Sequence, residues 1–175
     1  MKRPLRTARG YTLVEVLVVV TILGIAAAMI VPSMGSTSSL KVQGAVRTLV
    51  ADITEAQSDA LAYQTPRAIV FYPSENRYVV VEVRGNSVDP ETDTLLETSL
   101  SDGSFGDAHI EEAAFSYDLD ENPVLIFDEL GSPVVAPGSD TAAPTGEIIV
   151  SGSGQKFRVA VDAFTGRVTV TRISG

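Results

Sequence analysis

The chain opens with one long apolar segment. Residues 11–31 are apolar except at four positions, which are Thr12, Glu15, Thr21 and Gly24. As an α-helix this segment would span roughly 30 Å, which is the thickness of the hydrocarbon core of a bilayer. The pattern therefore predicts a transmembrane helix over residues 11–31.

An amphipathic pattern follows the apolar segment. Between residues 42 and 60, apolar side chains recur at spacings of three and four, which is typical of one face of a helix. They are Val42, Val46, Leu49, Ile53, Ala56 and Ala60. Pro66 bounds the run. We therefore predict an amphipathic stem helix over residues 32–66, with its apolar face packed on a sheet of the same chain.

From residue 68 the period shortens to that of β-strands. Six runs predict strands: 68–72, 77–83, 123–127, 146–152, 156–161 and 167–171. The last two form a hairpin through residues 163–166, where Gly166 suits a positive φ. The acidic segment 85–122 predicts a loop with one short strand, and residues 132–146 predict a second loop. A long helix followed by strands predicts an α+β fold with an antiparallel β-sheet head over residues 67–175.

Charge is distributed unevenly along the chain. The formal net charge is −9, although the first ten residues hold four basic side chains and no acid. Positive charge before an apolar segment places the amino terminus in the cytoplasm and sends the chain after Pro32 across the membrane. The acidic remainder disfavours general attraction to nucleic acid.

Glu15 decides between the explanations of the apolar segment. A cleaved secretory signal would place a small-residue cleavage site after the apolar run, and a plain signal anchor has no use for an acid. A charged group near the centre of a bilayer costs about 2–3 kcal/mol. Glu15 therefore calls for a partner of opposite charge.

Residues 9–32, RGYTLVEVLVVVTILGIAAAMIVP, resemble the processing signal of type IV pilins and type II secretion pseudopilins. The resemblance implies that residues 1–10 are a leader, which a prepilin peptidase cuts after Gly10 before methylating the new amino terminus at Tyr11. Phenylalanine is the usual residue at that position. It also implies that Glu15 of one subunit meets the terminal amine of its neighbour, which compensates both charges, and that Pro32 breaks the stem helix.

Three later segments resemble the GspH/FimT-like minor pilins and pseudopilins. They are AQSDALAYQTPRAIVFY, VLIFDELGSPV and IIVSGSGQKFRVAVDAFTGRVTV. The family tends to carry Ala-Arg on the stem, where this chain has Ala56-Gln57. The resemblance implies a structural subunit near a filament tip, whose partners are other pilins or pseudopilins and an inner-membrane assembly platform. It also implies a single-pass protein of the bacterial inner membrane with a periplasmic head, which later joins an extracytoplasmic filament. It does not separate a secretion pseudopilus from a type IV pilus.

Chemistry-bearing motifs are sparse. The chain has no cysteine and a single histidine, His109, which we expect in a solvated loop, and it has no hydrolase, zincin or P-loop motif. Two acidic segments, 118–122 and 89–93, lack the glycine and distal glutamate of an EF-hand and are interpreted as solvated loops. We expect no enzymatic activity, no cofactor and no metal.

Two other functions remain open. Lys156, Arg158, Arg167 and Arg172 lie on the final hairpin and could form a weak DNA patch, as in a pilus-associated minor pilin that binds DNA or another ligand for adhesion or DNA uptake. The acidic remainder argues against nucleic acid as a partner. An unprocessed single-pass anchor that presents an unrelated domain is the third alternative, and Glu15 argues against it.

Overall fold

The computed structural model describes residues 11–30 and 33–173. The chain divides into two compact units, Met1–Thr37 and Ser38–Gly175. Gly10, the predicted cleavage point, and Pro32, the predicted helix break, lie outside the described residues. We call the second unit the head.

The first unit contains helix α1, Leu13–Ile30. Among the described residues, no helix is both long and apolar enough to qualify as a membrane span.

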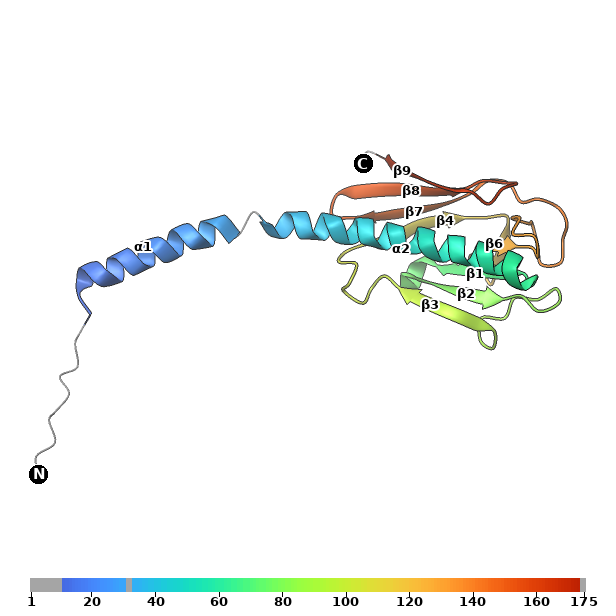
Figure 1. Ribbon diagram of the computed structural model, residues 1–175, viewed down its shortest axis with the longest axis horizontal. Coiled ribbons are helices and arrows are strands. Elements are labelled where there is room, and N and C mark those ends of the chain that lie inside the picture. The colour runs from blue at the N-terminus through green and yellow to red at the C-terminus, as the bar shows by residue number, and fades with distance from the viewer. Residues whose placement is uncertain (1–10, 31–32, 174–175) are drawn as a thin grey trace, which may run out of the picture. The chain divides into compact units, whose positions relative to one another are not determined.

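Helix α2, Ser33–Tyr63, supplies the helical layer of the head. All six apolar positions predicted for its buried face are at most 4% exposed, which confirms the predicted face. In Figure 1, α2 crosses in front of the strands, with β7–β9 on one side of it and β1–β3 on the other. The helix therefore covers two sets of strands at once.

The head contains two antiparallel sheets where we had expected one. The five-stranded sheet has the order β3-β2-β1-β6-β5, with β1 Arg67–Tyr72, β2 Arg77–Glu82, β3 Thr94–Ser99, β5 Tyr117–Leu119 and β6 Asn122–Phe127. The four-stranded sheet has the order β4-β7-β8-β9, with β4 His109–Ala114, β7 Gly146–Gly152, β8 Gln155–Val161 and β9 Val168–Ile173. A short 3-10 turn, η1 Pro73–Glu75, joins β1 to β2. All six predicted strands are present, and the α+β class is confirmed.

Two hydrophobic clusters hold the head together. The first lies between α2 and the sheets and includes Leu49, Phe71 and Ile148. The second includes Val70 and Val134 and lies on the other face of the five-stranded sheet. Because β1 is buried on both faces, its sequence after Arg67 is a continuous apolar run and does not alternate.

The prediction for residues 85–122 is wrong. This segment contains the whole of β3, β4 and β5, where we expected a loop with one short strand. The register shifts between Val80 and Val81 opposite β3, and between Ile110 and Glu112 within β4. Such irregularities break the alternation by which a strand is recognised, and both strands lie at the edge of their sheet. Residues 132–146 contain only isolated bridges before β7 begins, so the second predicted loop is confirmed.

One polar contact is built into the main core. Tyr78 is fully buried, and its hydroxyl donates a hydrogen bond of 2.6 Å to Asp52 Oδ2 on α2. Asp52 also accepts a hydrogen bond of 3.2 Å from the Thr98 hydroxyl. Burial first, and then the hydrogen bond to Asp52, raise the pKa of the Tyr78 hydroxyl well above its ordinary value of 10.

This raised pKa predicts a loss of stability at alkaline pH. Because the folded head holds the Tyr78 proton more tightly than the unfolded chain does, its stabilisation is complete below pH 10 and declines as the pH rises towards the folded pKa. We expect the free energy of unfolding, measured by urea denaturation in detergent, to fall as the pH rises above about 10, and to fall less in Tyr78→Phe. Tyr63→Phe, which changes an exposed ring, should keep the wild-type slope. Equal slopes for wild type and Tyr78→Phe would contradict this assignment.

Candidate functional site

Helix α1 begins at a cap that the sequence analysis missed. The Thr12 hydroxyl accepts a hydrogen bond of 3.2 Å from the backbone N–H of Glu15. The sequence Thr-Leu-Val-Glu fits the capping box, in which a threonine is followed three residues later by a glutamate. An acid in the first turn also interacts favourably with the positive end of the helix dipole. Glu15 therefore has a local structural role in addition to any role between subunits.

The surface of α1 is apolar all the way round. Large side chains from Leu13 to Ile25 are about half exposed or more. Thr21 does not interrupt this surface, because its hydroxyl donates a hydrogen bond of 2.8 Å to the Leu17 carbonyl. A helix that is apolar on every side is normally covered by protein or lipid. We therefore expect the described part of α1 to be buried against protein or lipid.

Tyr11 and Glu15 belong to the same face of this segment. They are one helical turn apart in sequence and line a shallow concave surface of about 360 Å³ together with Val16, Val19 and Val20. Tyr11, the residue expected at the processed terminus, thus lies on the same face as Glu15, the carboxylate expected to meet a terminal amine. Gly10, the third member of the predicted processing site, is not among the described residues.

Gln57 on α2 connects the carboxyl-terminal half of the chain to the helix. Its Nε2 donates hydrogen bonds of 2.7 Å to the Gly131 carbonyl and 2.8 Å to the Thr165 carbonyl. Gly131 lies in the turn after β6, and Thr165 lies in the turn between β8 and β9. The position at which the sequence departs from Ala-Arg is therefore the position that holds two distant turns to the helix.

An aspartate organises each of these two turns. Asp128 Oδ1 accepts hydrogen bonds of 2.9 Å from Leu130 N and 2.7 Å from Ser132 N. Asp162 Oδ1 accepts a hydrogen bond of 2.8 Å from the Thr165 hydroxyl, and this bond, with those from the Thr165 and Phe164 backbone N–H groups, lowers the pKa of Asp162. Hydrogen bonds of this kind from an aspartate to the following backbone stabilise tight turns.

The four basic residues of the final hairpin do not form one patch. Lys156 pairs with Glu111 at 2.6 Å and Arg158 with Glu147 at 2.9 Å, and the hydrogen bond from Lys156 is the main cause that lowers the pKa of Glu111. Arg172 is the cross-strand partner of Phe157, so it lies on the opposite face of the sheet from Lys156 and Arg158. Arg167 is exposed next to the β8–β9 turn.

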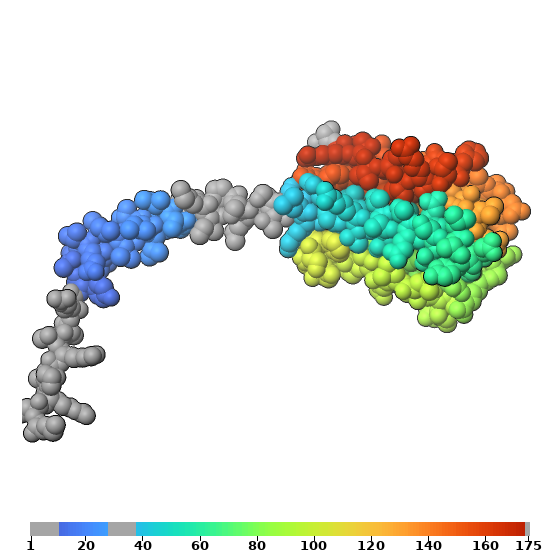
Figure 2. Space-filling view, viewed as in Figure 1, coloured from blue at the N-terminus to red at the C-terminus, as the bar shows by residue number. Residues whose placement is uncertain are grey.

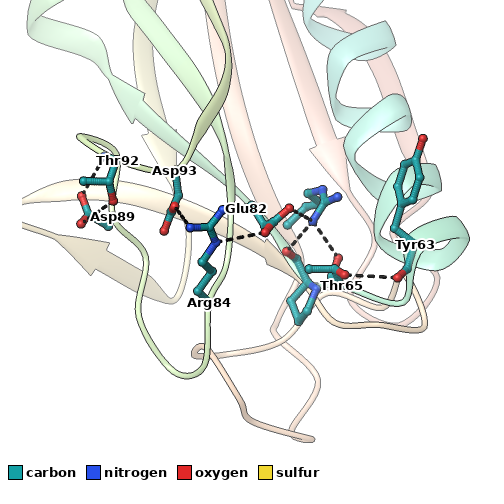
Figure 3. A network of polar contacts seen from close by, with 9 residues as sticks. Tyr63, Thr65, Glu82, Arg84, Asp89, Thr92 and Asp93 are labelled. Carbon is teal, nitrogen blue, oxygen red and sulfur yellow. Dashed lines mark hydrogen bonds and ion pairs between the residues drawn. The ribbon is translucent and has the colours of Figure 1, made fainter.

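The first acidic segment, residues 89–93, is used for internal contacts. Asp89 accepts hydrogen bonds from Glu91 N at 2.9 Å and from the Thr92 hydroxyl at 2.9 Å. Asp93 pairs with Arg84 at 2.9 Å. Figure 3 shows Asp89 and Thr92 at one end of this network, with Arg84 between Asp93 and Glu82. These carboxylates face residues of the same connection between β2 and β3.

The second acidic segment forms the β5–β6 turn. Asp120 and Glu121 adopt positive φ angles of 50° and 66°, and Asn122 Nδ2 donates a hydrogen bond of 3.0 Å to the Asp120 carbonyl. Asp118 lies on β5 and precedes the turn. In the part of the chain that the structure describes, no group of three or more histidine, aspartate or glutamate side chains is arranged to hold a metal ion.

His109 begins β4, where we had expected a loop. Its side chain is exposed, and its Nε2 lies 3.0 Å from the Ser151 hydroxyl on β7. Its Nδ1 lies 3.2 Å from the Asp107 carbonyl. These are local contacts at the end of a strand.

The comparisons with known proteins agree with this geometry. Residues 5–31 match the family described as Prokaryotic N-terminal methylation motif. The type IV minor pilin FimU of Pseudomonas aeruginosa has a similar structure, with a TM-score of 0.52, 15% identity and coverage of 77% of this chain and 91% of that one. The minor pseudopilin EpsH from the type 2 secretion system of Vibrio cholerae gives a TM-score of 0.50, 10% identity and coverage of 75% of this chain and 97% of that one. No curated protein sequence matches the chain.

The fold and the amino-terminal motif occur together in this chain. A long helix packed on an antiparallel β head is the fold of the minor pilin FimU, and the match to the methylation motif covers residues 5–31, which include all of α1. The chain therefore combines a prokaryotic N-terminal methylation motif with a pilin-like fold.

Proposed function

We propose that the protein is a structural, non-enzymatic minor pilin or pseudopilin, assembled into a type IV pilus or a type II secretion pseudopilus near its tip. Residues 11–31 hold it in the inner membrane as a single pass, with the head in the periplasm, until an assembly platform extracts it into a filament. The observation that carries this proposal is α1, which is exposed and apolar on every side and bears a carboxylate in its first turn.

In this proposal a prepilin peptidase cuts after Gly10, and Tyr11 becomes the methylated terminus. Glu15 then meets the terminal amine of a neighbouring subunit. A carboxylate and an amine buried together compensate each other, whereas either one alone is costly. Residues 11–31 supply the filament core, and Pro32 is the point at which the stem helix is broken.

The functional alternative is a pilus-associated minor pilin that binds DNA or another ligand. The sequence feature behind it is the basic hairpin. Two of its four cations, Lys156 and Arg158, are engaged by carboxylates, so the structural role is better supported.

Crosslinking in native membranes, followed by mass spectrometry of the captured partners, tests the proposal. We expect the partners to be pilin-like subunits and proteins of an inner-membrane assembly platform. Capture of secretion-platform proteins would identify a pseudopilus, and capture of pilus subunits with a retraction apparatus would identify a type IV pilus. Crosslinks to neither set, in cells that assemble filaments, would contradict the proposal.

A further inference from the structure

A groove runs along one side of α2, between that helix and strands β2 and β3. Its volume is about 530 Å³. Its apolar wall contains Leu95 and Leu96 of β3, which are 53% and 40% exposed. Two adjacent leucines on an edge strand form an apolar strip, and its exposure to water is unfavourable.

The helix side of the same groove is acidic. Asp52, Glu55 and Asp59 line it at spacings of three and four along α2, so they share one face of the helix. Asp52 is already bound by Tyr78 and Thr98. Glu55 is exposed and Asp59 is partly buried, and neither makes an ion pair with any described residue. Arg67 also lines the groove, but it is buried and pairs with Glu82. The groove thus presents an apolar wall opposite an acidic helix wall.

The other side of α2 carries the complementary chemistry. There Arg47 and Val50 of α2 and Phe157 and Val170 of the sheet line an apolar hollow of about 340 Å³. β9 is an edge strand of its sheet, and Val170 is 46% exposed on it. Edge strands are common points of contact with another chain.

Arg172 extends this second surface. Val170 and Arg172 are the cross-strand partners of Val159 and Phe157, so both lie on the face of the sheet that carries the hollow. Neither Arg47 nor Arg172 forms an ion pair within the described part of the head. Figure 2 shows α2 as a ridge between the strands of the two sides, with β9 in red and β3 in yellow-green.

We propose that the groove between α2 and β3 binds the Arg47–Val170–Arg172 surface of a second copy of this chain. Val170 packs on Leu95 and Leu96, and the two arginines approach Glu55 and Asp59. The inference rests on the proposed function in one respect, because it requires two heads to lie side by side, as neighbouring subunits of a filament do.

The geometry of this contact has two consequences. At about 1.5 Å per residue, Arg47 lies about 12 Å before Glu55 along α2, so neighbouring heads are displaced along the helix by about that distance. The two contacting surfaces are also different from each other. Such a heterologous contact leaves a free groove on one copy and a free β9 surface on the other, so a pair of heads joined in this way is asymmetric.

Cysteine crosslinking tests the contact without background from native thiols of this protein, because the chain contains no cysteine. Two differently tagged full-length copies, Leu96→Cys and Val170→Cys, are coexpressed in native membranes and treated with a short bis-maleimide. We expect a crosslinked pair carrying both tags. Thr169→Cys is the matched control, because its side chain lies on the opposite face of the same strand from Val170, and it should crosslink at least about tenfold less.

Charge exchange tests the chemistry of the same contact. Glu55→Arg with Asp59→Arg in the Leu96→Cys copy should reduce the crosslink at least about tenfold, and Arg47→Glu with Arg172→Glu in the other copy should restore it. Glu112→Arg with Glu121→Arg, which reverses two exposed charges elsewhere, should have no effect.

The possible failures are distinguishable. Absence of the Leu96→Cys to Val170→Cys crosslink in cells where the chain is processed and joins filaments would overturn the docking proposal alone. Capture of a different subunit at Leu96→Cys in place of a second copy would also overturn it. An unprocessed chain that never joins a filament would overturn the proposed function first.

Discussion

Glu15→Gln is expected to remove the protein from filaments while leaving both α1 and the head folded. Glutamine can replace glutamate in a capping box, so the helix cap at Thr12 survives, but the negative charge is lost. The neighbouring amine is then buried without its partner, which costs about 3–5 kcal/mol. This penalty corresponds to a loss of incorporation of at least roughly a hundredfold. The measurement is the fraction of protein recovered in sheared filaments, relative to the fraction left in membranes.

Two controls make this result specific to the charge of Glu15. Glu112→Gln removes an exposed carboxylate from the head and should assemble as the wild type does. The thermal unfolding of the head should be the same in all three proteins, because α1 and the head are separate compact units. Wild-type incorporation of Glu15→Gln would show that capping explains the glutamate and would contradict its role between subunits.

Gly166→Ala is expected to destabilise the head by about 2–4 kcal/mol, for two separate reasons. Gly166 has a φ of +64°, where a residue with a side chain is strained. A Cβ atom there would also lie 3.0 Å from Phe127 Cε1 and would collide with the Gln57 side-chain amide. The amide would have to leave its hydrogen bonds to Gly131 and Thr165. Urea denaturation of the protein in detergent measures the loss.

Gly154→Ala separates the two reasons. Gly154 has a φ of +69°, and a Cβ added to it meets nothing within 4 Å, so its substitution should cost only the backbone strain, about 1–2 kcal/mol. Removing the obstructing amide in Gln57→Ala with Gly166→Ala should cost less than the sum of the two single substitutions, because they share one contact. Equal losses for Gly154→Ala and Gly166→Ala would contradict the packing of Gln57 against the hairpin.

The helix face and the central strands could be predicted because their environment is uniform along their length. The buried face of α2 meets the sheets from Val42 to Ala60, so one helical period persists in the sequence. β1 after Arg67 and β6 after Asn122 are uninterrupted apolar runs that are covered on both faces. The turn at Gly166 was predictable because its positive φ favours glycine.

Edge strands were harder to predict because their burial is partial and irregular. In β4 only Ile110 is fully buried, and a register shift follows it. In β3 the leucines at 95 and 96 are adjacent and both exposed, which is unlike the alternation of a half-buried strand. Neither stretch carries a local period that distinguishes a strand from a polar loop.

The candidate site also has residues that the sequence could identify and residues that it could not. Tyr11 and Glu15 could be identified from the amino-terminal motif, since processing signals are contiguous in sequence. The role of Gln57 depends on turns that lie far from it in the chain, so no local pattern could reveal it. The two surfaces beside α2 likewise combine residues of the helix with residues of distant strands. The cap at Thr12 is a different case, because the Thr-Leu-Val-Glu sequence contained its signal.

The intact mass of the protein purified from its native membranes tests the central claim most directly. Our account predicts a chain that begins at Tyr11 and carries one added methyl group at its amino terminus, because the leader of residues 1–10 is removed before assembly. A chain that retains residues 1–10, in cells whose prepilin peptidase is active, would contradict the account. It would leave Glu15 without the amine that its position requires.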